Sequence, residues 1–254
     1  MKIIISPAKK MRVDNDAIVP WSQPAFLEQA GEIMHWMQKM DYTAAKTLWG
    51  CSDKIAQLCY DQLMHMDLLR TQELTPAVLA YDGIAYQYMA PAVFEDHQFN
   101  YVQEHLYILS GLYGVLRAMD GIVPYRLEMN NKAKVAGTRS LYEYWGDLIY
   151  KRVIDGSHLV INLASKEYSI CVEKYLIEED RMITCIFGEL SDHKPEKIVQ
   201  KGVYAKMARG DMVRYMAENQ IEDPGMLKEY DRMGYLFNED RSTDRQYIFL
   251  KTKD

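Results

Sequence analysis

Short runs of β-branched and other apolar residues alternate along this 254-residue chain with segments in which apolar residues recur at steps of three and four. The runs are typical of buried strands, and the stepped spacing is typical of helices with one apolar face. Because strands that alternate with helices pack as a sheet covered by helices, the sequence predicts a mixed α/β fold with a central mixed sheet and flanking helices. The predicted strands are 2–6, 106–110, 158–163, 182–187, 235–237 and 246–250, and the predicted helices are 26–37 and about 53–69, 140–153, 166–177 and 195–219.

The same pattern sets the expected domain organisation. Residues 7–24 contain three prolines and are expected to be irregular. The strands at 235–237 and 246–250 are separated by one polar loop, which predicts an antiparallel hairpin at the sheet edge. The chain has no internal repeat and no low-complexity linker, so we expect a single domain over residues 1–254.

The composition argues against a membrane-spanning or disulfide-rich protein. No window approaches the roughly eighteen apolar residues of a membrane span, and proline and lysine interrupt the first ten residues too early for a secretory signal. We therefore expect a cytoplasmic protein with no membrane partner. The cysteines lack C-x-x-C spacing and the histidines lack metal-ligand spacing, so we expect reduced core thiols, no metal site and no cofactor. The cysteines are Cys51, Cys59, Cys171 and Cys185, and the histidines are His35, His65, His97, His105, His158 and His193.

The formal net charge of −6 by itself opposes binding to an anionic partner, but the charges are unevenly distributed. Residues 1–12 carry four cations and no acid, residues 194–214 carry six cations against two acids, and residues 218–244 carry eight acids. Such polarity lets one face hold DNA while acidic surface elsewhere limits non-specific binding. Charge alone favours the alternative, in which these runs are ordinary solvated faces.

Ser6-Pro7-Ala8-Lys9-Lys10 follows the first predicted strand, at the carboxyl end where open α/β sheets place their ligand crevices. A loop stiffened by proline presents a hydroxyl and two ammonium groups, which suits a phosphate. The Ser6-x-x-Lys9 spacing also matches the serine–lysine nucleophile pair of some acyl-transfer enzymes, although their accompanying motifs are missing. Phosphate contact is the favoured interpretation, and a plain surface loop stays open.

Three tyrosines between Tyr81 and Tyr88 surround an Asp-Gly turn. Tyrosine rings such as that of Tyr86 stack on nucleic-acid bases, and each stacked base contributes about 1–3 kcal/mol. The alternative is that these rings are half-buried with satisfied hydroxyl groups, as for most tyrosines.

The segment from Leu106 to Met129 combines glycines with arginines. A turn bounded by Gly111 and Gly114 lets backbone N–H groups approach a phosphate, the principle of helix-hairpin-helix DNA-binding modules. The side chains of Arg117 and Arg126 are each able to hold a phosphate or a carboxylate bidentately. The alternative is a structural pair with Asp120 or Glu128.

Two further segments carry candidate cations on predicted helices. Ser165 is placed to cap the helix that follows it, whereas Lys166 is disfavoured at a helix N-terminus unless Glu167 or a bound anion lies near it. In the helix at 195–219, the cations Lys206, Arg209 and Arg214 fall within one arc, opposite a face of alanine and methionine. Gly210 lies beside them, which suggests that something approaches the backbone there.

Taken together, five segments of this sequence resemble the signature blocks of the YaaA family of bacterial peroxide-stress proteins. They are ISPAKKM, YDGIAYQY, LSGLYGVLR with PYRLEM, NLASKEYS and YAKMARGDMVRY, spread over residues 3 to 215. The resemblance implies a fold peculiar to the family, survival of hydrogen peroxide through low free intracellular iron, and DNA binding in a basic cleft with a helix-hairpin-helix-like element. It implies no known catalytic reaction. The cleft candidates that it gives are Lys9, Lys10, Arg117, Arg126, Lys166, Lys206, Arg209 and Arg214, with Gly111 and Gly114 as the hairpin.

The leading hypothesis is therefore a non-enzymatic DNA-binding stress protein that selects DNA structure rather than base sequence. If six to eight of the cations contact phosphates, the logarithm of affinity should fall against the logarithm of salt concentration with a slope of roughly −5 to −7. The alternative is an enzyme acting on a nucleic-acid or phosphorylated substrate in the same cleft, with Ser6 and Lys9, or Lys166 and Glu167, in nucleophilic or acid–base roles. Direct iron sequestration is a third hypothesis, although no spacing gathers the carboxylates that it needs.

Overall fold

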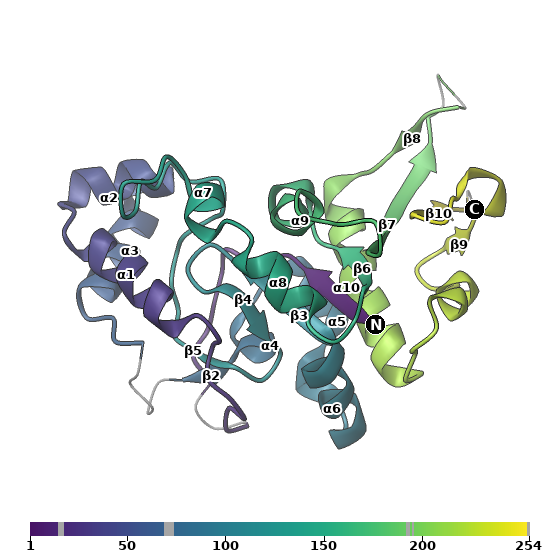
Figure 1. The fold of residues 1–254 in the computed structure, drawn as a ribbon, viewed down its shortest axis with the longest axis horizontal. Coiled ribbons are helices and arrows are strands. Elements are labelled where there is room, and N and C mark those ends of the chain that lie inside the picture. The colour runs from purple at the N-terminus through teal and green to yellow at the C-terminus, as the bar shows by residue number, and fades with distance from the viewer. Residues whose placement is uncertain (15–17, 69–73, 192–193, 195, 253–254) are drawn as a thin grey trace.

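The computed structural model describes residues 1–14, 18–68, 74–191, 194 and 196–252, and Figure 1 labels their helices and strands in chain order. The strands are β1 (Lys2–Ile5), β2 (Thr75–Pro76), β3 (Leu106–Ser110), β4 (Gly114–Arg117), β5 (Gly121–Ile122), β6 (Leu159–Leu163), β7 (Arg181–Leu190), β8 (Ile198–Val199), β9 (Tyr235–Phe237) and β10 (Gln246–Lys251). The α-helices are α1 (Leu27–Gln38), α2 (Tyr42–Trp49), α3 (Asp53–Met64), α4 (Ala77–Ala80), α5 (Ile84–Met89), α6 (Asp96–His105), α7 (Leu141–Trp145), α8 (Leu148–Ile154), α9 (Lys166–Glu173) and α10 (Gly202–Glu218). Three-residue to six-residue 3-10 helices cover Pro91–Val93, Pro224–Glu229 and Glu239–Arg241.

One mixed sheet organises the chain, with the strand order β4-β3-β1-β6-β7-β10-β9 and with β8 attached to β7. Strand β1 lies parallel to both β3 and β6, and β7 continues the parallel part to β10. The three isoleucines of β1 are almost completely buried, because helices cover both faces of a parallel sheet. The predicted mixed α/β fold is confirmed.

The edges of the sheet are antiparallel. Strand β4 pairs with β3 at one edge, and β9 pairs with β10 at the other, so the hairpin predicted for 235–237 and 246–250 is confirmed. Strand β8 pairs with the outer half of β7 and projects from the molecule at the upper right of Figure 1.

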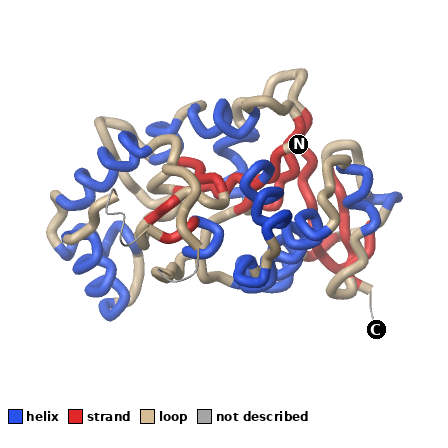
Figure 2. The backbone as a smooth tube through the Cα atoms, turned by 90° about the horizontal axis from the view of Figure 1, so that it is seen from below, coloured by secondary structure: helices blue, strands red, loops and turns tan. Residues whose placement is uncertain are grey.

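Helices pack on both faces of the sheet, as Figures 1 and 2 show. Helix α8 packs on β1, β4 and β6 and against α9, whereas α10 packs on β7 and against α5 and α6. Helices α1, α2 and α3 gather at the end of the molecule away from β9 and β10. The short strands β2 and β5 pair separately from the main sheet.

The structure differs from the sequence prediction at several helix boundaries. The predicted helix at 140–153 is divided into α7 and α8, because Gly146 adopts a positive φ of 49° that ends α7. Helices α3, α9 and α10 are shorter than predicted. Residue 69 of the predicted helix at 53–69 and residue 195 of the predicted helix at 195–219 lie outside the described residues. His193 and residues 15–17 of the predicted irregular stretch also lie outside them.

The turn at Gly111 and Gly114 differs most from the sequence prediction. Gly111 and Gly114 join strands β3 and β4, which pair in an antiparallel hairpin, and not two helices. The helix-hairpin-helix prediction for this segment is therefore wrong. LYILS and GVLR are short, largely apolar runs on the two sides of the turn, a pattern that is consistent with buried strands.

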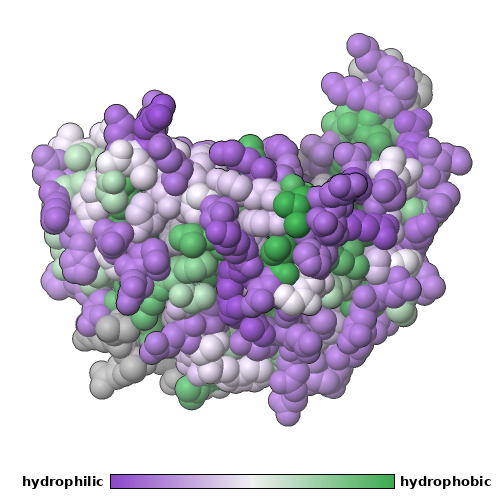
Figure 3. All heavy atoms as spheres, in the orientation of Figure 1, coloured by the Kyte–Doolittle hydropathy of each residue, from purple (hydrophilic) through white to green (hydrophobic). Residues whose placement is uncertain are grey.

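One face of the molecule is mainly hydrophilic. On the face drawn in Figure 3, hydrophilic residues predominate and apolar residues gather in separate patches, one of them below the projecting segment at β8. Among the described residues, no helix combines the length and the apolar character needed to cross a membrane.

Candidate functional site

A cavity of about 380 Å³ opens where β1 and β6 end. These neighbouring strands lead away in opposite directions, since the chain returns beside β1 as β3, whereas β6 continues to β7. Such a divergence creates a crevice at the carboxyl ends of parallel strands, where open α/β sheets bind ligands. We call this cavity the switch-point pocket. It is lined by Ile5, Ser6, Pro7, Ala8, Lys9, Lys10, Asp82, Gly83, Ile84, Ala85, Tyr86, Glu128, Leu163, Ser165, Glu167, Tyr168, Lys206 and Arg209.

Four of the five segments singled out in the sequence contribute to this lining through several residues each, and the fifth contributes Glu128. The loop after β1, the turn before α5, the start of α9 and the middle of α10 therefore meet at one place. A cavity therefore lies at the end of β1, where the sequence predicts a ligand crevice.

Two serines connect the loop after β1 to the start of α9. The Ser6 hydroxyl accepts a hydrogen bond from the Ser165 backbone N–H at 2.9 Å and donates to the Ser165 hydroxyl at 3.2 Å. Ser165 occupies the N-cap position of α9 as predicted, but its hydroxyl makes no capping hydrogen bond. Ser6 is thus held by Ser165 and not by Lys9, so the predicted serine–lysine nucleophile pair has no geometric support.

Close backbone packing places α10 against α5 beside the pocket. A Cβ atom at Gly210 would lie 1.8 Å from the backbone oxygen of Ala85, so only glycine permits this helix crossing. The close approach that Gly210 suggested is therefore confirmed, and the neighbour is helix α5. A similar contact brings the turn before α5 against the loop after β1, where a Cβ at Gly83 would lie 2.6 Å from Cβ of Ala8. These two glycines bring three sequence segments into the pocket wall.

Arg209 is the cation whose surroundings differ most from those of an ordinary surface arginine. Its Nε is buried without a hydrogen-bond partner, and no ion pair is formed with any carboxylate among the described residues. Burial lowers the pKa of Arg209 from its usual value, because the charged guanidinium is withdrawn from water. Lys206, one turn before it, is exposed and also lacks an ion pair within the described part of the chain. A half-buried arginine with a buried, unpartnered Nε is suited to a bound anion.

Carboxylates line another part of the same pocket. Burial raises the pKa of Glu128, and the charge of Glu167 raises it further, while Lys9 acts in the opposite direction. The hydroxyl of Tyr168 donates to Glu128 Oε2 at 3.3 Å, and Glu167 Oε1 accepts from the backbone N–H of Asn130 at 3.2 Å. Two neighbouring carboxylates with different environments are typical of sites that move protons.

Sequence reasoning considered Glu128 only as a structural partner of Arg126, and it missed Tyr168. No ion pair joins Glu128 and Arg126 in the structure, although the charge of Arg126 lowers the pKa of Glu128. The sequence feature that indicated a site role for Glu128 is its position within PYRLEM, one of the segments that carry the family resemblance.

Several predicted cations are neutralised by carboxylates of their own. Lys10 lines the pocket but forms an ion pair with Asp82. Lys166 is exposed and paired with Glu173, and Arg214 is paired with Glu218 at 2.7 Å. Neither Lys166 nor Arg214 lines the pocket.

The two remaining predicted arginines also lie outside the pocket lining. Arg117 Nε donates to the backbone oxygen of Gln103 at 2.6 Å, and its guanidinium lies over the ring of Tyr107. Arg126 has a buried Nε without a partner among the described residues, but the pocket does not include it. Of the eight predicted cations, Lys9, Lys10, Lys206 and Arg209 line the pocket, and the other four do not.

The predicted hairpin glycines have packing roles. A Cβ at Gly111 would lie 2.5 Å from the backbone oxygen of Leu127, so this glycine brings the segment containing Glu128 against the β3–β4 turn. Gly114 has a φ of 69° and lies against the ring of Trp145. Both residues are buried, so their backbone groups are not open to a phosphate.

The rings of Tyr81 and Tyr86 are buried and offer no face to a base. Their centroids lie 5.2 Å apart, and the Tyr86 hydroxyl donates to the backbone oxygen of Ser6 at 3.0 Å. The expectation that these tyrosines stack on bases is therefore wrong for both rings. Tyr86 instead supports the loop that carries the pocket serine.

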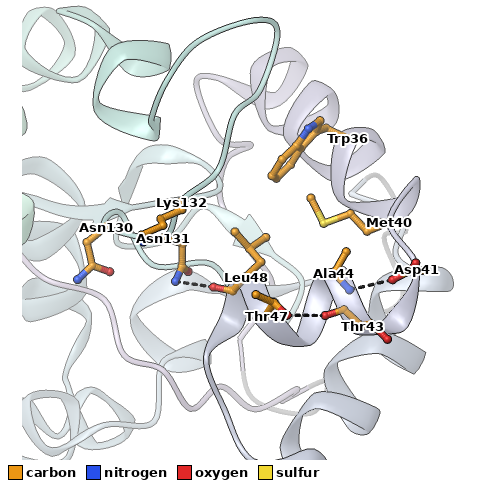
Figure 4. A pocket seen from close by; sticks show the side chains of 10 residues that line it. All are labelled: Trp36, Met40, Asp41, Thr43, Ala44, Thr47, Leu48, Asn130, Asn131 and Lys132. Carbon is orange, nitrogen blue, oxygen red and sulfur yellow. Dashed lines mark hydrogen bonds between the residues drawn. The ribbon is translucent and has the colours of Figure 1, made fainter.

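A second hollow of about 730 Å³ lies between α1, α2 and the loop at 130–132, and Figure 4 shows its lining. Three of its polar side chains are engaged with backbone groups: Asp41 accepts from Ala44 N, Thr47 donates to the Thr43 oxygen, and Asn131 donates to the Leu48 oxygen. Trp36 and Met40 supply much of the remaining surface. Although larger, this hollow lacks the convergent charged groups of the switch-point pocket.

The cysteines are all free thiols. Cys171 and Cys185 are buried, and burial raises the pKa of each to about 12, so neither is activated. Cys51 and Cys59 are only partly buried. Among the described residues, no group of three or more histidine, cysteine, aspartate or glutamate side chains is arranged to hold a metal ion.

Comparison with known proteins agrees with the sequence resemblance. A family described as "Peroxide stress protein YaaA" matches residues 1–241. A UPF0246 protein of Agathobacter rectalis is 54% identical over 249 residues, which cover 98% of each chain. UPF0246 proteins of Pediococcus pentosaceus and Lachnoclostridium phytofermentans are 48% and 45% identical, over 100% and 99% of this chain and 99% and 96% of theirs.

Proposed function

Because this chain belongs to the family of the peroxide stress protein YaaA, we propose that it binds DNA during peroxide stress and holds a DNA phosphate in the switch-point pocket. The observation that supports this proposal is the half-buried Arg209, whose Nε is buried without a hydrogen-bond partner and which has no carboxylate partner among the described residues. Lys206 and Lys9 contribute positive charge to the same pocket. The selection is for DNA structure, since a phosphate carries no base sequence.

The expected salt dependence is smaller than the sequence alone suggested. Lys10, Lys166 and Arg214 are neutralised by carboxylates, which leaves Lys9, Lys206 and Arg209 as the pocket cations without an ion pair among the described residues. Three phosphate contacts give a slope of about −3 for the logarithm of affinity against the logarithm of salt concentration on duplex DNA.

The test is a fluorescence anisotropy titration of duplex, bubble and single-stranded oligonucleotides over a salt series. Arg209→Gln removes a charged hydrogen bond worth about 1.5–3 kcal/mol and should weaken binding by tenfold or more. Arg214→Gln is the matched control, because Arg214 lies on the same helix but is paired and outside the pocket. Absent binding, salt-independent binding, or equal effects of the two substitutions would contradict the proposal.

The proposed cellular role is a lower level of free iron and less oxidative DNA damage under peroxide. In a bacterial strain that lacks this gene, expression of the wild-type chain should restore survival in hydrogen peroxide and lower free iron, measured by electron paramagnetic resonance. Arg209→Gln should do neither if the pocket is responsible, and full restoration by this variant at equal expression would oppose the role.

A second candidate function is an enzyme acting on a nucleic-acid or phosphorylated substrate, and the carboxylates of the pocket favour it. Burial and Glu167 raise the pKa of Glu128, a condition for acid–base work near neutral pH. Any turnover of a phosphorylated substrate should then depend on pH through Glu128 and be lost in Glu128→Gln. Turnover with an unchanged pH profile in this variant would exclude Glu128 as the proton-transfer group.

A further inference from the structure

The switch-point pocket has two chemically different regions. Lys206 and Arg209 of α10 form its cationic region, and Glu128 and Glu167 form its acidic region. The two regions come from different elements, since Lys206 and Arg209 belong to α10, Glu167 belongs to α9 and Glu128 precedes α7, and no ion pair joins Arg209 to either carboxylate among the described residues. A ligand that meets both regions must be anionic in one part and rich in hydrogen-bond donors in another.

Apolar residues form much of the remaining lining. Ile5, Pro7, Ile84 and Leu163 line the pocket, and β1 and β6 carry buried core residues. The cavity volume of about 380 Å³ is near the lower limit of the roughly 300–1,000 Å³ that is usual for small-ligand pockets. It suits a single nucleotide-sized group.

We propose that the switch-point pocket binds one nucleoside 5′-phosphate unit, with the phosphate on Arg209 and Lys206 and the hydroxyl or amino groups of the nucleoside on Glu128 and Glu167. Carboxylates accept hydrogen bonds from such donors, and arginine holds phosphate oxygens bidentately. The assignment rests on the proposed function in that it takes the pocket to be the phosphate-binding site.

The same chemistry is offered by a free mononucleotide and by the 5′-terminal nucleotide of a DNA strand. A terminal phosphate monoester carries a charge of about −1.5 to −2 near pH 7, whereas a diester within the strand carries −1. Lys206 and Arg209 together match the charge of the monoester better than that of a diester. A 5′-phosphorylated end should therefore be preferred over both a 5′-hydroxyl end and an internal phosphate.

Isothermal titration calorimetry with adenosine 5′-monophosphate, adenosine and inorganic phosphate tests the assignment on the full chain. The nucleotide should bind more tightly than either part alone, and Arg209→Gln should weaken it about ten- to hundredfold. Lys206→Ala, at an exposed position that does not threaten folding, should weaken it about two- to fivefold. Arg214→Gln should leave it unchanged. No nucleotide binding, or equal binding by wild type and Arg209→Gln, overturns the assignment.

Anisotropy with single-stranded oligonucleotides that differ only in a 5′-phosphate or 5′-hydroxyl end distinguishes the two sources. Tighter binding of the phosphorylated strand, displaced by adenosine 5′-monophosphate, identifies the strand end as the ligand. Arg209-dependent nucleotide binding without an end preference identifies a free nucleotide.

The experiments also distinguish failure of the nucleotide assignment from failure of the proposed DNA binding. DNA binding that is weakened by Arg209→Gln but is indifferent to the nucleotide overturns the nucleotide assignment and leaves the proposed function. Nucleotide binding that depends on Arg209, combined with DNA binding that does not, overturns the proposed function and leaves the pocket assignment.

Discussion

At the scale of single residues, the unusual feature is a contrast between two arginines on one helix. Arg214 lies four residues before Glu218 and pairs with it along the surface of α10. Arg209 turns toward the pocket, where its Nε is buried without a partner among the described residues. The i,i+4 spacing of an ion pair can be read from the sequence. A buried arginine nitrogen without a partner cannot be read from it, because the groups that surround the side chain come from segments distant in the sequence.

Behind the pocket, a buried chain of hydroxyl groups fixes the segment that precedes Glu128. The Tyr125 hydroxyl lies 2.7 Å from the Tyr81 hydroxyl and 2.6 Å from the Ser110 hydroxyl, and all three residues are buried. The Ser110 hydroxyl also accepts from the Tyr113 N–H at 2.9 Å, so removing the Tyr125 hydroxyl leaves the buried Tyr81 hydroxyl without its partner, which costs more than the bond itself contributes.

We predict that Tyr125→Phe lowers the free energy of unfolding by about 1–3 kcal/mol. Tyr88→Phe is the control, since Tyr88 is exposed and its substitution should change stability by less than about 0.5 kcal/mol. Urea unfolding of the two variants measures the difference. Equal stabilities would show that the hydroxyl chain contributes nothing.

At the scale of elements, the crossing of α10 and α5 decides where the pocket cations lie. Gly210 allows the two helices to touch through their backbones, and Lys206 and Arg209 reach the pocket from this position. Glycine within a helix costs about 1 kcal/mol relative to alanine, so the close crossing offsets a local penalty.

We predict that Gly210→Ala destabilises the protein by roughly 1–3 kcal/mol and weakens phosphate binding, because the added Cβ pushes α10 away from α5. Gly31→Ala is the matched control in α1, where nothing lies within 4 Å of an added Cβ, and it should stabilise by about 0.5–1 kcal/mol. Thermal unfolding and anisotropy measure both effects. The two substitutions are expected to change the free energy of unfolding in opposite directions. A Gly210→Ala variant with unchanged stability would mean that the two helices do not meet this closely.

At the scale of the whole molecule, a buried aspartate connects α8, β6 and the loop before β7. Asp180 accepts hydrogen bonds from the Tyr150 hydroxyl at 2.7 Å and from the Ile177 N–H at 3.0 Å, and His158 Nδ1 lies 2.7 Å from it. Burial opposes its ionisation, but these hydrogen bonds outweigh burial and hold the pKa of Asp180 below the usual 3.8. A depressed carboxyl pKa stabilises the folded state above the usual pKa, and the stabilisation is lost as pH falls.

We predict that Asp180→Asn lowers the free energy of unfolding by about 1–3 kcal/mol near pH 6 and that the difference from wild type shrinks toward about pH 3. Asp155→Asn is the control, since Asp155 is exposed and makes only a surface pair with Arg152. Denaturant unfolding across this pH range measures both variants. A difference that is constant with pH would exclude Asp180 as a source of acid sensitivity.

The sequence predicted the elements of the sheet well, because strand and helix patterns have short periods and depend on which faces are buried. All six predicted strands are present, and the location of a site after β1 follows from a general property of parallel sheets. Boundaries were less accurate where a single backbone angle ends a helix, as at Gly146.

What the sequence by itself determined is a mixed α/β sheet, the motif segments that meet at its switch point and the family to which they belong. Only the tertiary structure decided which cations stay unpaired, that Gly111 and Gly114 turn between strands, and that the Tyr81 and Tyr86 rings are buried. The physical reason is the separation along the chain of the residues that decide each property. Periodicity is set by neighbours along the chain, whereas neutralisation and burial depend on residues such as Asp82 beside Lys10, which only folding brings together.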